Sequence, residues 1–261
     1  SEDEKERVRG SFPEVTIIFG DNPETPPTDG FVILGTPIGT QEFITRALHD
    51  RVLGKLQATL RHVWKLPTQY LLHVVATCVS DCRLTHWMRT VPTQFLAQTA
   101  KNYYEEVTYV VDDRLDIKHR LDPQETMIYE RRLALPNRRG GLGIRDPSVY
   151  MSAAFLSSVI SAHKVLVDAE QPGLPLNGEY ATHVASALDH FNQLVTGGDV
   201  IGNWEYLANL DHEKTTQKAL SQRIIKKRYN ELFNRVNLDQ KKSILTASQS
   251  NASAWLRPVV S

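Results

Sequence analysis

Apolar residues recur every three or four positions along most of this chain, which is the spacing of amphipathic α-helices. The longest series begins after Thr40, a residue type that accepts the first free N–H groups of a helix, and it continues to Pro67. Later prolines and aspartates fit the first turns of further helices and divide the pattern into segments. The expected helices span residues 40–66, 68–90, 93–115, 122–134, 148–167, 180–195, 204–210, 215–236 and 238–247.

The first forty residues follow a different pattern, in which β-branched and aromatic runs are separated by turn residues. Residues 15–19 and 31–34 are expected to form short strands. The second strand leads into residues 35–39, Gly-Thr-Pro-Ile-Gly, where two glycines and a proline favour a tight bend before the long helix. Because two strands alone are marginally stable, we expect partner strands upstream.

These patterns predict a mainly α fold, a multi-helix bundle with a small β element of two strands at the N-terminus. The chain is expected to contain three regions. They are the strands and turn of residues 1–39, a helical domain over residues 40–170, and a C-terminal helical region over residues 179–261 that contains a basic helix. A stretch rich in proline and glycine separates the last two regions.

Composition favours an intracellular protein with a substantial core. Its 261 residues are 41% apolar, no run of 18 apolar residues indicates a membrane span, and the charged first residues differ from a signal peptide. With only Cys78 and Cys82, reduced thiols are expected, in the nucleus or the cytoplasm. The chain starts without Met and within patterned sequence, which favours a segment of a longer polypeptide.

The 30 basic and 30 acidic residues balance, which argues against a protein that coats nucleic acid, but they are unevenly distributed. Between residues 214 and 242 nine basic residues face two acidic ones, and five arginines gather between residues 131 and 145. Phosphate backbones select such patches, although a solvated helix face offset by acids elsewhere has the same pattern. The candidates for nucleic-acid binding are Arg138, Arg139, Arg145, Lys218, Arg223, Lys226, Lys227 and Arg228.

Three motifs resemble chemical sites, and none is expected to catalyse a reaction or to bind a metal. Residues 109–113, Tyr-Val-Val-Asp-Asp, have one residue too many for a Tyr-x-Asp-Asp polymerase motif and lie on an expected helix. Cys78, Cys82 and His86 share a helix face without a fourth ligand, so buried free cysteines are favoured. The glycine-rich loop at residues 138–144 fits either a turn that binds phosphate backbones or one required for packing.

The order of several motifs is more specific than any one of them. The segment at residues 30–39 is followed by helices, by a Leu-Pro to Gly-Gly-Leu-Gly-Ile loop at 135–144, and by a small-residue helix with Ala-Ala-Phe-Leu-Ser-Ser at 153–158. In this order they resemble the carboxy-terminal half of reverse transcriptases from non-LTR, LINE-like retrotransposons. The tail at residues 250–256, Ser-Asn-Ala-Ser-Ala-Trp-Leu, resembles a further block of the same proteins.

This resemblance covers residues 30–160 and 250–257, and it implies a place for each region. The first strands and turn would form the end of the palm, beside the primer grip, and the following helices would form the thumb. The primer-grip-like residues would be Leu34, Gly35, Thr36, Pro37, Ile38 and Gly39.

The resemblance also implies that the parent protein is an RNA-directed DNA polymerase that uses Mg²⁺, with its catalytic carboxylates upstream. This chain is then expected to have no catalytic residues and no cofactor. It would hold an RNA template and an RNA/DNA hybrid duplex beside the palm and fingers of the same polyprotein. The alternative is an α-helical scaffold or protein-interaction module with no nucleic-acid role. An independent hydrolase is disfavoured, because no nucleophile, base and orienting residue occur at a recognisable spacing.

Overall fold

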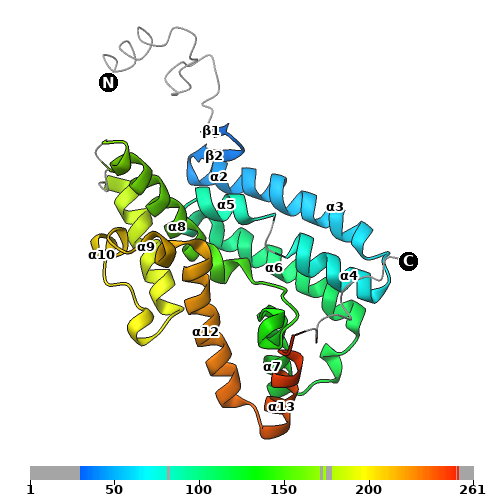
Figure 1. Ribbon diagram of the computed structural model, residues 1–261. Coiled ribbons are helices and arrows are strands. Elements are labelled where there is room, and N and C mark those ends of the chain that lie inside the picture. Colours follow the sequence, from blue (N-terminus) through cyan, green and yellow to red (C-terminus); the bar gives the residue numbers. More distant parts are fainter. Residues whose placement is uncertain (1–29, 81–82, 171–172, 175–177, 251, 253–261) are drawn as a thin grey trace.

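The computed structural model describes residues 30–250 and Ala252, apart from short gaps at 81–82, 171–172 and 175–177. Within these residues the protein is mainly α-helical with a two-stranded antiparallel sheet near the N-terminus, as the sequence predicts (Figure 1). The α-helices are α2 (Gln41–Leu48), α3 (Gly54–Val63), α4 (Thr68–Val74), α5 (Thr85–Thr90), α6 (Thr93–Leu115), α7 (Pro123–Ala134), α8 (Pro147–Asp168), α9 (Gly178–Gln193), α10 (Trp204–Ala208), α11 (His212–Thr215), α12 (Gln217–Arg235) and α13 (Leu238–Ala247). Short π-helical and 3₁₀ turns are η1 (His49–Leu53), η2 (Val75–Val79), η3 (Lys118–Arg120), η4 (Asn137–Arg139) and η5 (Gly197–Asp199).

The two strands form a hairpin, which corrects the bend expected at residues 35–39. Strand β1 (Gly30–Ile33) pairs antiparallel with β2 (Thr36–Gly39), and the turn between them contains only Leu34 and Gly35. Both turn residues have positive φ, 48° and 89°, as two-residue hairpin turns require. The predicted bend was too long, because residues 36–39 form the second strand. Pro37 is compatible with that strand because β2 lies at the edge of the sheet. The other expected strand, at residues 15–19, lies outside the described residues.

Most expected helix boundaries are confirmed by the caps that form there. The Thr40 hydroxyl accepts a hydrogen bond from the Phe43 N–H, and Asp122 and Glu125 form a reciprocal capping box at the start of α7. The single helix expected over residues 68–90 is wrong, because α4 and η2 end at Val79 and α5 begins at Thr85. The buried Tyr103 hydroxyl donates to the Val79 carbonyl where the first helix ends, so a side chain from α6 satisfies that group.

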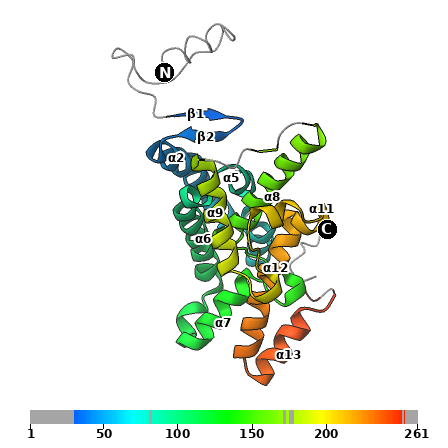
Figure 2. The same ribbon diagram turned by 90° about the vertical axis from the view of Figure 1, so that its left-hand side faces the viewer.

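Helix α8 packs against α5, α6, α9 and α12, and α6 and α9 also contact each other (Figures 1 and 2). Its small residues are buried, which permits the close approach of several helices. Met151 and Ala154 belong to a core built with α2 to α6, whereas Ala153 and Phe155 belong to a second core built with α9 and α12. The two cores therefore share one helix.

Helix α8 is also long and apolar enough, by length and composition, to cross a membrane. However, 61% of its apolar window is buried inside the protein, as in the core helix of a globular fold. We therefore interpret α8 as the packing centre of the bundle.

Candidate nucleic-acid interface

The six primer-grip-like residues lie together on the hairpin, at one end of the molecule. Pro37 is buried, whereas Leu34 at the tip is 92% exposed and Ile38 on β2 is also exposed. The hairpin is tied to α5 by a contact of 3.2 Å between the Thr36 hydroxyl and Nε2 of His86. The hairpin thus presents an open apolar tip while its base is fixed to the helical bundle.

A large cavity opens beside α5, and we call it the basic pocket. Its volume is about 760 Å³, within the range of ligand sites in proteins. Arg89, Arg138, Arg145 and Lys218 line it, and none of the described residues that line it is Asp or Glu. The remaining polar residues of its wall are Thr77, Asn137, Tyr150, Gln217, Ser221 and Gln222.

The four cations of the basic pocket come from three parts of the chain that are far apart in the sequence. Arg89 comes from α5, Arg138 from η4, Arg145 from the segment before α8, and Lys218 from the first turn of α12. Arg89 donates two hydrogen bonds, from Nε and Nη2, to Oε1 of Gln217 at 2.9 and 2.8 Å. Sequence reasoning missed Arg89, because it is a single arginine on its helix and reaches the other cations only through tertiary packing.

The glycine-rich loop positions Arg138 at the rim of the pocket. Gly140 has φ of 74°, and a Cβ placed on it would lie 2.4 Å from the Ile244 carbonyl of α13. A Cβ on Gly141 would lie 2.1 Å from the Leu135 carbonyl. These close approaches favour packing as the reason for both glycines. The exposed Arg138 side chain makes no hydrogen bond or ion pair with the described residues, so it is available to a ligand.

Three other candidates form a separate group further along α12, which we call the distal cluster: Arg223, Lys226 and Lys227. Lys226 pairs with Oδ2 of Asp199 at 3.1 Å, and Arg223 donates to the Asp199 carbonyl. Lys227 donates to the Gln193 carbonyl at 2.8 Å and also lies 3.9 Å from a Glu231 carboxylate oxygen. Each basic residue of the distal cluster therefore has a hydrogen-bond or ion-pair partner within the protein.

Of the last two candidates, Arg139 has an aromatic partner, and Arg228 lies in a cavity with acidic residues. The Arg139 guanidinium lies over the Tyr229 ring, 4.9 Å from its centroid. Arg228 lines a cavity of about 280 Å³ together with Tyr104 and three acidic residues. Those acids are Glu130, Asp146 and Glu231.

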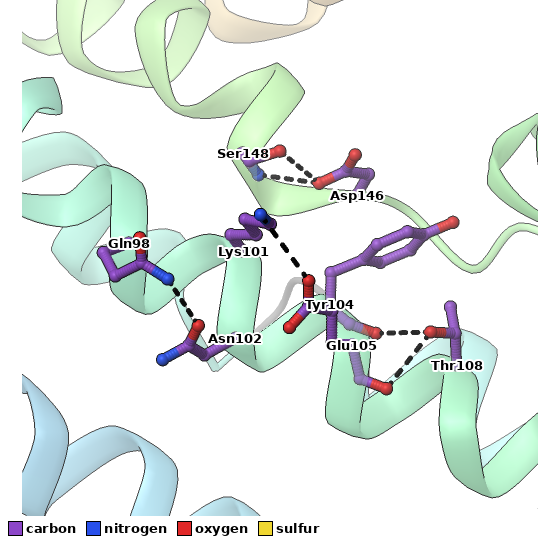
Figure 3. A network of polar contacts seen from close by, with 8 residues as sticks. All are labelled: Gln98, Lys101, Asn102, Tyr104, Glu105, Thr108, Asp146 and Ser148. Carbon is purple, nitrogen blue, oxygen red and sulfur yellow. Dashed lines mark hydrogen bonds and ion pairs between the residues drawn. The ribbon is translucent and has the colours of Figure 1, made fainter.

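Tyr104 and Asp146 show why that smaller cavity differs from the basic pocket. Figure 3 shows Tyr104 extending from α6 toward the start of α8, where the Ser148 N–H and hydroxyl both donate to Asp146. Burial raises the pKa of the Tyr104 hydroxyl above its ordinary value, the Asp146 carboxylate raises it further, and Arg228 opposes both effects. The smaller cavity thus mixes the positive charges of Arg228 and Arg131 with three acidic residues, whereas the described lining of the basic pocket has none.

The paired carboxylates at residues 112–113 lie on α6, and one of them has structural partners. Asp112 accepts a hydrogen bond from the Tyr129 hydroxyl at 2.8 Å and lies 3.3 Å from Lys118. Burial and the hydrogen bond to Asp112 raise the pKa of Tyr129. These contacts join α6 to α7.

The expectation of buried cysteines is wrong for Cys78. Cys78 is exposed rather than buried, because the π-helical turn η2 carries it on the outer side of the bundle. Cys82 lies outside the described residues, and His86 contacts the hairpin. The tail block at residues 250–256 also lies outside them, except for Ser250 and Ala252.

Comparison with protein families, with curated protein sequences and with solved structures finds no match for this chain.

Proposed function

We propose that this chain is the end of the palm and the thumb of a reverse-transcriptase-like protein, and that it holds an RNA template and an RNA/DNA hybrid by backbone contacts. The observation that carries the proposal is the basic pocket, where four cations converge without an acidic residue in the described lining. Phosphate contacts position a nucleic acid without reading its sequence. Arginine supplies forked hydrogen bonds to phosphate oxygens, and lysine supplies a point charge.

Helix α5 connects the two parts of the proposed interface. His86 contacts Thr36 of the hairpin, and Arg89, three residues later, lines the basic pocket. Residues three apart lie on one face of a helix, with a rise of about 4.5 Å between them. A strand in the pocket would therefore lie along the helix that contacts the hairpin, which is the arrangement that the resemblance to a primer grip implies.

The test is the salt dependence of binding to an RNA/DNA hybrid, measured by filter binding. The double variant Arg138→Ala/Lys218→Ala removes two exposed cations of the pocket and leaves the core intact. The slope of log affinity against log salt should decrease by about one for each lost phosphate contact. A slope that does not change in this variant contradicts the proposal.

The matched control is Lys226→Ala/Lys227→Ala, which removes the same amount of charge from two residues of α12, the helix that carries Lys218. Because these lysines have internal partners, the loss of affinity should be smaller than in the pocket variant. An equal loss in both double variants would indicate a diffuse charge effect.

A second candidate function is protein interaction, and the exposed hairpin favours it. Leu34 is 92% exposed, and Ile33 and Ile38 beside it are about half exposed. Such apolar residues often mark binding sites for other proteins. Failure of the wild-type chain to bind either heparin or the hybrid at low salt would favour this alternative.

A further inference from the structure

The basic pocket concentrates positive charge in a small concave volume. Its four cations come from α5, from the loop between α7 and α8 and from α12, around about 760 Å³, and the described lining contains no Asp or Glu. A concave site lined by one sign of charge focuses the electrostatic potential more strongly than a flat surface does. The ligand that gains most from such a site has several negative charges on a few atoms.

Further along α12, two of the cations lie beside acidic residues. Two turns beyond Lys218, Lys226 is paired with Asp199, and Lys227 lies close to Glu231. A duplex presents single charges about 3.4 Å apart along each strand, so it gains most from an extended row of cations. A terminal phosphate group, above all a triphosphate, matches an isolated pocket better.

One arginine in the wall of the pocket is held in a fixed orientation, and neighbouring side chains add further hydrogen-bonding groups. Gln217 holds the Arg89 guanidinium through two hydrogen bonds, which fixes the orientation of its planar fork before a ligand arrives. Half-buried Ser221 and Gln222 add a hydroxyl and an amide to the lining. Because Arg89 is already oriented, less side-chain entropy is lost when an anion binds.

We propose that the basic pocket binds the 5′-terminal triphosphate of an RNA strand whose next nucleotides run toward the hairpin. The proposal rests on the proposed function, because α5 joins the pocket to the hairpin through Arg89 and His86. The triphosphate would bind in the pocket, and the nucleotides that follow it would contact the exposed hairpin tip. A free polyphosphate would bind in the pocket but would make no contact with the hairpin.

The experiment compares two short single-stranded RNAs of one sequence, one with a 5′-triphosphate and one with a 5′-hydroxyl, by fluorescence anisotropy. The triphosphate RNA should bind about tenfold more tightly, the effect of one well-formed charge-assisted contact. Arg138→Ala/Lys218→Ala should reduce this preference to about twofold or less, and Lys226→Ala/Lys227→Ala should retain it. Equal binding of the two RNAs, or a preference that survives loss of Arg138 and Lys218, overturns the proposal.

Two further measurements test the charge of the pocket wall and the need for an RNA strand. Gln217→Glu adds a carboxylate to the wall without removing a cation, so it should lower the triphosphate preference while thermal unfolding stays unchanged. Titration with inorganic tripolyphosphate by calorimetry should show weaker binding than the triphosphate RNA. Equally tight tripolyphosphate binding overturns the strand-end proposal in favour of a free polyanion.

The outcomes also separate this inference from the proposed function. If the hybrid binds and the 5′ end makes no difference, the strand-end proposal is overturned and the proposed function stands. If the wild-type chain binds neither the hybrid nor either RNA, the proposed function fails, and the strand-end proposal falls with it.

Discussion

The basic pocket and the distal cluster share one helix, and they differ in what surrounds their cations. Lys218 begins α12 among other cations, whereas Lys226 and Lys227 occur two turns later beside Asp199 and Glu231. On the sequence, the distal residues form the denser basic run. In the fold, Arg138 and Lys218 of the sparser set are exposed beside a pocket whose described lining has no acidic residue.

This difference shows that a count of basic residues is a poor measure of an anion-binding surface. Each lysine of the distal cluster is offset by an acid or a carbonyl that the sequence places tens of residues away. In contrast, Arg89 and Lys218 meet in the pocket although 128 residues separate Arg89 from Gln217, the neighbour of Lys218. We expect the pairing of the cations, rather than their number, to separate the two regions.

The largest effect is expected from a glycine substitution in the loop that carries Arg138, and a glycine beside the distal cluster provides its control. Gly140→Ala places a Cβ against the Ile244 carbonyl at positive φ, so the free energy of unfolding should fall by about 2 kcal/mol or more. Gly198 lines the cavity of the distal cluster with nothing within 4 Å of its added Cβ. Gly198→Ala should be neutral or should stabilise by up to about 1 kcal/mol. Urea unfolding measures both, and equal losses would contradict the packing role of Gly140.

An intermediate effect is expected when Lys226 of the distal cluster loses its acidic partner, Asp199. Asp199→Asn releases Lys226, so the distal face should come to resemble the pocket, and affinity for the hybrid should rise about threefold at low salt. Asp113→Asn makes the same charge change at an exposed site on α6. Filter binding should show a smaller change for Asp113→Asn. Equal gains would mean that net charge alone decides binding.

The smallest effect is expected at Arg139, the neighbour of Arg138. Its guanidinium lies over the Tyr229 ring, so Arg139→Ala should lower the free energy of unfolding by about 0.5–1 kcal/mol and leave hybrid affinity within about twofold. Arg138→Ala should do the opposite, weakening binding without affecting stability. Thermal melts and filter binding on both variants provide the comparison, and a binding loss at Arg139 would extend the interface beyond the pocket.

Much of the fold follows from local sequence. The capping residues Thr40 and Asp122 mark helix starts because a short polar side chain satisfies N–H groups that the helix leaves free. The break after Val79 could not be predicted in the same way. It depends on the Tyr103 hydroxyl, which comes from a different helix.

The candidate site was predictable only in part, for the same reason. Arg138, Arg145 and Lys218 could be found because they belong to basic patches of the sequence. Arg89 could not, because nothing near it along the chain is unusual. The hairpin turn at Leu34 was also missed, since a leucine with positive φ is contrary to its intrinsic preference and is observed only in the paired strands.

Because helix α8 belongs to both cores, neither half of the molecule should be stable without the other. Because Met151 and Ala154 complete one core while Ala153 and Phe155 complete the other, unfolding of either half should expose part of a helix that the other half needs. The two halves should therefore unfold in a single cooperative step. A truncation that ends after α8 should aggregate when produced alone, and it should become soluble when the missing C-terminal half is supplied as a separate chain.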